Sequence, residues 1–473
     1  MKRIGTFVLF FWVLMTCFFS ESAAQPLAVR LKNAVQSLGA DPQMKHATWS
    51  LVVADAVTGA ILFDHNGQAA LAPASTLKVI TSITAFELLG IDFRYETRLG
   101  YRGRLSDGTL EGDMILQGSG DPSLGSWRYA GTGSEDLLGQ MGNAMVARGI
   151  RYVHGDIIAD TAGWNNEPIP DGWIWQDMGN YYGAGSWKFN WNENQYDVIL
   201  KSGRQPGSVV EIVSTKPVLA GVTLRSALTA GPDGSGDNAY IYLPPFAREG
   251  VIRGTIPPAK ESFSISGSLP DPPKQFASQL KEVLAEDKIT VAGNIKLNEY
   301  PVAAVSGDNF QLLFSHKSPT LDSLVYWFLR KSINLYGESL IRTMGLKQYG
   351  NASTKNGVEA VLEFWKNYGI EPGALQLMDG SGLSPQNRIT AMALVQSLQY
   401  ARKRPWFRSF YEGLPVYNGM KLKSGSINGS RAFAGYHTAA NGKTYTVAIM
   451  VNNYTGSASG MVRKMFLVLD YLK

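Results

Sequence analysis

Residues 77–89 form a stretch of helical length that is apolar on almost every side. A helix without a polar face must be buried, so this stretch requires a domain large enough to surround it. The preceding residues, 49–64, contain two apolar runs with Thr58 and Gly59 between them, which predicts a β-hairpin. We therefore expect a strand pair that leads into a core helix, with Ser75 at the junction.

Ser75 and Lys78 lie three residues apart at the start of that helix, and this spacing puts their side chains on one face. A serine hydroxyl becomes nucleophilic when a neighbouring base takes its proton, and the apolar neighbours of Lys78 favour its neutral, basic form. The helix N-terminus adds N–H groups that suit an oxyanion. Ser278 and Lys281 have the same spacing, but they belong to a charged amphipathic helix, residues 276–288, and we interpret them as surface residues.

Length and charge narrow the function classes. A chain of 473 residues suggests about three units of about 150 residues each. The formal net charge of +5 is small and dispersed, which argues against a nucleic-acid partner. The five histidines show no metal-ligand spacing, so neither a metal nor another cofactor is predicted.

The first residues have the pattern of a secretory signal peptide. Two basic residues are followed by an apolar run, residues 6–19, and by small residues at 22–24, which predicts cleavage after residue 24. The alternative is an uncleaved anchor, but a run of about 14 residues is shorter than the ~20 that span a membrane. The single cysteine, Cys17, lies in this run, and Thr16 and Phe18 beside it disfavour lipid attachment. We expect an exported, periplasmic or extracytoplasmic protein with no membrane span, which can rest on a membrane surface.

Strand and helix patterns divide the rest of the chain. Residues 93–304 show short alternating runs separated by Gly, Pro, Asp and Asn, which predicts a β-rich insertion, interpreted as two domains. Helical periodicity returns at 320–330, 335–344, 358–368 and 390–403, and three strands are predicted at 421–426, 433–438 and 444–451 before a last helix. Residues 25–92 and 305–473 are therefore expected to form one α/β (α+β) domain, an antiparallel sheet flanked by helices.

Eight aromatic residues crowd the middle of the insertion. They can fill small cores, which is the usual role of such residues, or form a platform for carbohydrate or peptide. The sequence leaves both interpretations open for Trp164, Trp173, Trp175, Tyr181, Tyr182, Trp187, Phe189 and Trp191.

Ser332 and Asn334 fall on the turn between two predicted helices. A hydroxyl at this position can relay a proton between Lys78 and a leaving group, and an amide can hold the lysine or a substrate carbonyl. The pattern is weak alone, because a serine beside a helix is often only a cap, and Ser426 and Asn428 also fit it.

A third motif, Lys423, Ser424, Gly425 and Ser426, lies on the first of the three terminal strands. The lysine and hydroxyl can bind a carboxylate, Gly425 can let a substrate backbone approach, and the Ser426 N–H can point at an oxyanion. Residues 201–203 repeat the motif at the end of an insertion strand. The interpretation of the three motifs as one site is strengthened by their order along the chain and by the structural context of each.

Together these motifs resemble S-x-x-K, S-x-N and K-[T/S]-G of the penicillin-recognising serine enzymes. The chain is most similar to the class C low-molecular-mass penicillin-binding proteins, the peptidase S13 family of D-alanyl-D-alanine carboxypeptidases with an endopeptidase side activity. The segment from Val52 to Ser75, the loops 117–122 and 379–384, and the long insertion between Ser75 and Ser332 carry this resemblance.

The resemblance implies a role for each motif residue. Ser75 is acylated with Lys78 as base, and Ser332 and Asn334 shuttle the proton. The pair Lys423 and Ser424 binds the terminal carboxylate. Further implied roles are an oxyanion hole from the N–H groups of Ser75 and Ser426, contact with the free amine of the stem diamino acid by Asp160, stem peptides of peptidoglycan as substrate, and β-lactam antibiotics as acylating inhibitors.

Two positions depart from the family pattern. Ser424 replaces the commoner threonine, and Ile333 stands where aspartate is common. Two rival functions stay open: a serine β-lactamase, disfavoured by the large insertion, and a non-catalytic wall-binding or sensing protein of the same fold. The balance between carboxypeptidase and endopeptidase activity and the oligomeric state are not determined by the sequence.

Overall fold

The computed structural model describes residues 26–164, 167–298 and 310–473. The predicted signal peptide, residues 1–24, lies outside the described residues, as does the predicted end of the insertion at residue 304. Within the described ranges, no helix has both the length and the apolar character needed to cross a membrane.

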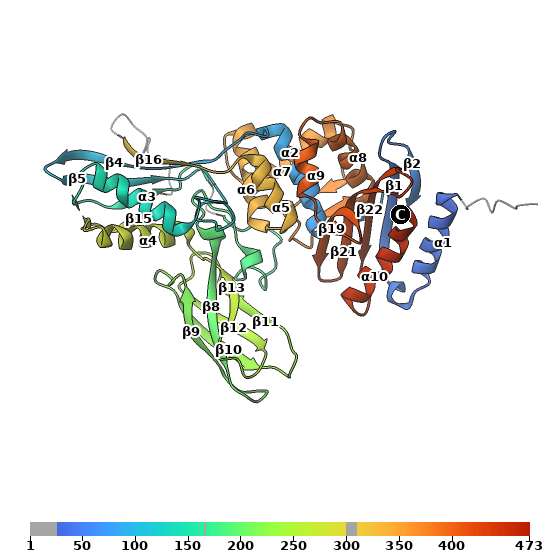
Figure 1. Ribbon diagram of the computed structural model, residues 1–473, viewed down its shortest axis with the longest axis horizontal. Coiled ribbons are helices and arrows are strands. Elements are labelled where there is room, and N and C mark those ends of the chain that lie inside the picture. Colours follow the sequence, from blue (N-terminus) through green and yellow to red (C-terminus); the bar gives the residue numbers. More distant parts are fainter. Residues whose placement is uncertain (1–25, 165–166, 299–309) are drawn as a thin grey trace, which may run out of the picture.

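Strands from both ends of the chain form an antiparallel sheet (Figure 1). β1 pairs with its hairpin partner β2, as predicted, and with β22 on its other side, from Thr48 opposite Asn452 to Asp55 opposite Tyr445. The described strands run in the order β19 (Val416–Tyr417), β20 (Met420–Ile427), β21 (Ser430–Thr438), β22 (Thr444–Asn452), β1 (Thr48–Asp55) and β2 (Ile61–His65).

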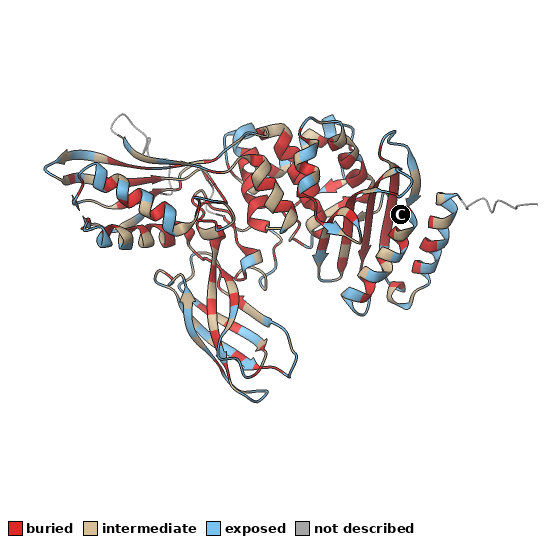
Figure 2. Cartoon of the chain, in the orientation of Figure 1, coloured by how far each residue is buried: buried red, intermediate tan, exposed pale blue. Residues whose placement is uncertain are grey.

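Helices cover both faces of this sheet because its strands are apolar on both sides. In β1, Val52 and Ala54 face one hydrophobic core, and Leu51 and Val53 face another, as the two-residue period of a strand requires. Buried residues accordingly run through the sheet and the helix faces against it (Figure 2). One face holds α1 (Leu27–Gly39) and α10 (Ala458–Leu469); the other holds α2 (Leu77–Leu89), α5 (Leu321–Arg330), α6 (Asn334–Tyr349), α7 (Thr354–Asn367), α8 (Ala391–Arg402) and α9 (Phe407–Gly413).

The apolar helix α2 lies at the centre of the larger core, and every residue in it except Glu87 and Leu88 is buried. It ends at Gly90, whose φ of 90° is in the region that glycine adopts without strain. The predicted fold class, an antiparallel sheet flanked by helices with an inserted β-rich region, is confirmed. The short helix α9 was not predicted.

The insertion has a first lobe built on a long mixed sheet. Its hairpin, β4 (Glu96–Ser106) and β5 (Thr109–Gln117), continues into the parallel strands β6 (Tyr152–Val153), β7 (Ile157–Asp160), β14 (Thr290–Val291) and β15 (Ile295–Asn298). The helices α3 (Ser134–Ala147) and α4 (Pro272–Glu286) pack against this sheet (Figure 1). An unpredicted strand, β16 (Gln311–Lys317), pairs with β4. We therefore propose that the insertion ends near Lys317.

A second lobe consists of two small sheets. Described strands β13 (Phe263–Ser268), β8 (Gln195–Ser202) and β9 (Val210–Lys216) form one, and β10 (Thr223–Ala230), β12 (Glu249–Ile256) and β11 (Asn238–Tyr242) form the other. One hydrophobic cluster runs through both lobes. The division of the insertion into two domains therefore stays a prediction.

Candidate active site

The structure brings the Ser75 hydroxyl and the Lys78 amine together at the start of α2. Ser75 lies on a 3-10 turn, Ala74–Thr76, that runs straight into the helix. The Lys78 Nζ is 2.9 Å from the Ser75 Oγ. Ala74 has a φ of 46°, a costly conformation for a residue with a side chain, and such strain is often found at functional sites.

The partners of Lys78 suit a neutral amine. Its Nζ donates to the Asn334 Oδ1 at 2.7 Å and to the backbone oxygen of Ser381 at 2.6 Å, and both of these atoms are acceptors. A neutral amine has two hydrogens and one lone pair. With both hydrogens donated, the lone pair is left for the third partner, the Ser75 hydroxyl, which can donate its own proton.

Burial adjusts the basicity of Lys78 to the same task. The side chain is inaccessible to solvent, and this loss of hydration lowers the pKa of Lys78 to about 7, against the opposing charges of Asp379 and Glu338. A general base is most effective when its pKa lies near the working pH. Lys78 therefore has both the position and the pKa that a general base for Ser75 requires.

Two buried carboxyl groups, Glu338 and Asp379, favour the charged form of the Lys78 amine, and neither was predicted to belong to the site. Both oxygens of Glu338 are 3.2 Å from the Gly380 N–H, which places the neighbouring Ser381 carbonyl. Burial, reinforced by the charge of Asp379, raises the pKa of Glu338 to about 8. Asp379 accepts four hydrogen bonds, from the N–H groups of Gly382 and Ser384, the Asn387 Nδ2 and the Trp173 Nε1.

The second predicted motif lies on the turn between α5 and α6. Asn334 is the first residue of α6, and its Nδ2 donates to the backbone oxygen of Tyr182, in the insertion, at 2.7 Å. Ser332 has a φ of 58°, which turns the chain sharply between the helices. Ile333 packs against the hydrophobic core. This contact accounts for an apolar residue at a position where the family pattern has aspartate.

The third motif lies on β20 and contacts the second. Lys423 is 1% exposed; its Nζ donates to the Ser332 Oγ at 3.0 Å and to the Ser424 backbone oxygen at 2.9 Å. Burial, together with the charge of Lys78, holds the pKa of Lys423 well below its usual range. The Ser424 Oγ donates to the Tyr417 hydroxyl at 3.1 Å.

Gly425 serves a contact different from the predicted one. A Cβ atom there would lie 2.3 Å from the Pro73 backbone oxygen and 3.1 Å from the Ser75 nitrogen. The close approach that needs glycine is therefore between β20 and the turn that carries Ser75, within the protein. It also brings Ser426, the next residue, beside that turn.

A cavity of about 700 Å³ is lined by residues of all three motifs, but Lys78, Lys423 and Ser424 are not among them. The sheet domain contributes Ser75, Ser332, Asn334 and Ser426 to its lining, and the insertion contributes the opposite wall with Ile174, Gln176, Asp177, Tyr182 and Tyr240. The insertion is thus part of the site.

Asp160 does not line this cavity. It ends β7, its carboxylate is 3.3 Å from the Lys188 Nζ, and it also accepts from the Ala162 N–H. The carboxylate in the cavity wall is that of Asp177, whose pKa is raised by burial against the effect of the Tyr182 hydroxyl. In the sequence, the position of Asp177 within the aromatic-rich segment is the feature that could have indicated a place in the site.

The aromatic cluster divides into two groups. Trp164, Trp173, Trp187, Phe189 and Trp191 are buried, as the core-filling interpretation predicts. The other three are not buried: Trp175 and Tyr181 are 55% and 52% exposed, and Tyr182 is half-buried in the cavity wall.

The two rejected motif copies lie elsewhere. Lys281 Nζ donates to the Gly293 backbone oxygen on the insertion surface. Lys201 forms an exposed ion pair with Glu261.

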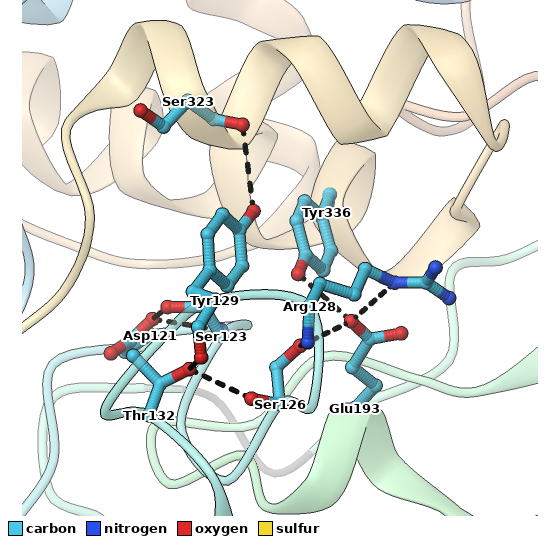
Figure 3. Close-up of polar contacts among 9 residues, drawn as sticks. All are labelled: Asp121, Ser123, Ser126, Arg128, Tyr129, Thr132, Glu193, Ser323 and Tyr336. Atoms are coloured by element: carbon cyan, nitrogen blue, oxygen red, sulfur yellow. Dashed lines mark hydrogen bonds and ion pairs between the residues drawn. The ribbon is translucent and has the colours of Figure 1, made fainter.

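A buried polar network ties the insertion to the helices that hold the second motif (Figure 3). The Glu193 Oε1 accepts from the Ser126 Oγ at 2.7 Å, the Arg128 Nε at 2.8 Å and the Tyr336 hydroxyl at 3.0 Å. Tyr336 lies on α6, two residues after Asn334. The Tyr129 hydroxyl reaches the Ser323 backbone oxygen on α5 at 3.5 Å.

Comparison with known proteins finds a matching family model and related sequences. The D-Ala-D-Ala carboxypeptidase 3 (S13) family matches residues 31–469. A D-alanyl-D-alanine carboxypeptidase from an Actinomadura species is 26% identical, over 90% of this chain and 82% of the relative.

Solved structures show the same fold. The crystal structure of penicillin binding protein 4 (dacB) from Haemophilus influenzae matches with a TM-score of 0.78 and 23% identity, over 93% of this chain and 97% of the other. The structure of that protein complexed with a novel β-lactam matches with a TM-score of 0.74 and 22% identity, over 94% and 98%.

Proposed function

The chain belongs to the D-Ala-D-Ala carboxypeptidase 3 (S13) family, and on that premise we propose that it is a serine peptidase that works through an acyl-enzyme on Ser75. The observation that carries the proposal is the 2.9 Å contact between the Ser75 Oγ and the buried Lys78 Nζ. The substrate is the stem peptide of peptidoglycan, from which the terminal D-alanine is removed.

Acylation begins when Lys78, as the neutral amine, takes the Ser75 proton. The Ser75 Oγ then bonds to the carbonyl carbon of the penultimate D-alanine, and the N–H groups of Ser75 and Ser426 stabilise the oxyanion. As the peptide C–N bond breaks, the proton passes from Lys78 through Ser332 to the leaving amine. Water then attacks the ester carbonyl carbon and gives a proton to Lys78. The bond to the Ser75 Oγ breaks, Lys78 returns the proton to that oxygen, and the shortened peptide leaves.

Lys423 and Ser424 are proposed to bind the terminal carboxylate of the substrate. Support comes from the Lys423 Nζ, whose only hydrogen-bond partners in the described residues are the Ser332 Oγ and the Ser424 backbone oxygen. Burial holds the pKa of Lys423 low; a substrate carboxylate beside the amine would raise that pKa, favour the ammonium and form a charge-assisted hydrogen bond with it.

For the free amine of the stem diamino acid, we propose Asp177 in place of Asp160. The carboxylate of Asp177 lines the cavity that contains Ser75, whereas that of Asp160 is paired with Lys188. A carboxylate facing an ammonium across a partly buried wall gives a charge-assisted hydrogen bond.

We further propose that β-lactams acylate Ser75, since penicillin binding protein 4 of the same fold has been solved with one. Residues 1–24 are proposed to direct export to the periplasm or another extracytoplasmic space. The same site can cut D-alanyl cross-links, because that reaction differs only in the amine that leaves.

The test is D-alanine release from a pentapeptide stem, combined with labelling by a fluorescent penicillin and mapping of the labelled peptide. The wild type should release D-alanine and carry the label on Ser75, and Ser75→Ala should do neither. Ser278→Ala, in the second copy of the motif, is the matched control and should keep both. Labelling without release would support the non-catalytic binder, and rapid turnover of the penicillin would support a β-lactamase.

A further inference from the structure

An aromatic strip of two half-buried tyrosines and one exposed tryptophan leads out of the catalytic cavity onto the second lobe of the insertion. Tyr240 lines the cavity, and Tyr242 follows two residues later on β11, so the two side chains share a face of the strand. Trp175, 55% exposed, packs on Tyr242 with ring centroids 5.8 Å apart. We call these three residues the aromatic strip.

The strip is not needed to fill a core. Between the two tyrosines, Ile241 is fully buried and faces the hydrophobic cluster of the insertion. Tyr240 and Tyr242 therefore stand on the opposite, solvent-facing side, where a strand usually carries polar residues. Large aromatic side chains on such a face mark a binding surface.

A cation completes the surface. Arg253 on β12 lies opposite Tyr240 in the strand register, and its guanidinium is 5.4 Å from the Tyr242 ring centroid. The strip thus offers flat apolar faces together with hydroxyl and guanidinium groups that can hydrogen-bond.

We propose that the aromatic strip binds the glycan strand to which the stem peptide is attached. This inference rests on the proposed function, since it places the D-alanine end of the stem at Ser75. An extended stem of five residues spans at most about 17 Å, so its sugar must lie near the mouth of the cavity. The strip begins in the cavity wall and continues outside it, which is the course that the substrate must follow.

The chemistry favours sugar over other occupants. Pyranose rings have apolar faces that stack on aromatic rings, and their hydroxyls accept from the Arg253 guanidinium and exchange hydrogen bonds with the tyrosine hydroxyls. A second stem peptide, which would bring charged groups, is the alternative that the experiment below distinguishes.

The test compares Trp175→Ala with Trp127→Ala, a tryptophan of nearly equal exposure, 55% against 56%, that is not in the strip. Each is measured on a free pentapeptide and on glycan chains that carry pentapeptides. The preference, the ratio of kcat/KM for the glycan-linked substrate to that for the free peptide, should fall about tenfold in Trp175→Ala through KM. The control should keep the wild-type preference.

Binding is tested separately from catalysis with glycan strands stripped of peptides and the Ser75→Ala chain. This chain should bind them, and adding Trp175→Ala or Tyr242→Ala should weaken the Kd about tenfold. The inference is overturned if stripped strands do not bind, if Trp127→Ala has an equal effect, or if the loss in Trp175→Ala is the same on a sugar-free cross-linked peptide. D-alanine release by the wild type shows, in every case, whether the proposed function itself stands.

Discussion

At the scale of single residues, the site depends on a lysine deprived of water. Lys78 has two acceptors and one hydroxyl around its Nζ, and its charged form is disfavoured by burial. The same loss of hydration that makes the ammonium unstable makes the amine a base. The carboxyl groups of Glu338 and Asp379 moderate the effect without contacting the substrate cavity.

Acylation should therefore depend on pH through Lys78. The reactive form is the neutral amine, so the rate of penicillin labelling should rise with pH, with a midpoint near the lysine pKa of about 7, and then level off. Below this pH the ammonium cannot take the Ser75 proton. The profile is measured by penicillin labelling that is stopped at set times at a series of pH values. A labelling rate that does not change between about pH 5 and 8 would contradict this role for Lys78.

Substitutions of Glu338 give a second test that uses the same pH profile of penicillin labelling. A carboxyl group with a pKa of about 8 is largely protonated, and therefore uncharged, at the pH where Lys78 titrates. Glu338→Gln is neutral at every pH and keeps an oxygen for the Gly380 N–H, so it should leave the midpoint close to that of the wild type. Glu338→Ala leaves the Gly380 N–H without its acceptor and should lower the rate at every pH.

The two aspartates of the insertion give a paired prediction. Asp177→Asn should raise KM about tenfold for a stem peptide with a free side-chain amine, because a charge-assisted hydrogen bond is lost. Asp160→Asn should leave KM unchanged, since its partner is Lys188. Acetylating the substrate amine should remove the difference between Asp177→Asn and the wild type, and equal effects of both substitutions would contradict the assignment.

At the scale of elements, the site forms where β20 packs closely against the turn before α2. Gly425 permits this contact, because any side chain would meet the backbone at Pro73 and Ser75. Backbone atoms cannot rotate away as a side chain can. The position of Ser75 is therefore coupled to the packing of a strand from the other end of the chain.

Gly425→Ala should destabilise the protein by about 1–3 kcal/mol, as overpacking in a core does, and should slow acylation of Ser75. The control is Gly139→Ala on α3, where nothing lies within 4 Å of an added Cβ; there alanine should stabilise the helix by about 0.5–1 kcal/mol. Urea unfolding and penicillin labelling measure both effects. Wild-type stability in Gly425→Ala would show that the strand can move away.

Local patterns predicted the elements that carry the site and missed those that depend on distant pairing. The α2 range matched because its apolar run is continuous, and the three terminal strands matched because their alternation is clear. β16 was missed, since its place beside β4 is a long-range pairing. The assignment of Asp160 rests on the family resemblance alone, and the sequence does not single out Asp177, because it does not show which carboxylate lines a cavity.

At the scale of the whole molecule, the insertion and the sheet domain build one site between them. The insertion supplies a cavity wall, the acceptor for the Asn334 amide, a donor to Asp379 and the network around Glu193 (Figure 3). The hydrogen bonds among these contacts end on α6, at Asn334 and Tyr336, or on the loop 379–384, at Asp379. The relative position of the two parts therefore determines the position of the second motif.

Tyr336→Phe tests this connection. It removes one donor from the buried Glu193 Oε1 and should cost about 1–3 kcal/mol, with a lower Tm in calorimetry. The control is Tyr349→Phe on the same helix, whose hydroxyl donates to the Glu363 Oε2 at 2.8 Å on the surface and should change stability by less than about 0.5 kcal/mol. Equal losses in the two variants would mean that the buried network contributes no more than a surface contact.

The pairing of β1 with β22 also imposes an order on biogenesis. β1 is one strand of the hairpin before Ser75 and pairs on its other side with β22, residues 444–452. The chain must therefore be made as far as residue 452 before that side of the sheet can form. Contacts between such distant segments form slowly, whereas the hairpin of the insertion is local and can form early. A chain that ends before residue 444 therefore carries Ser75 and Lys78 without the strand that pairs with β1.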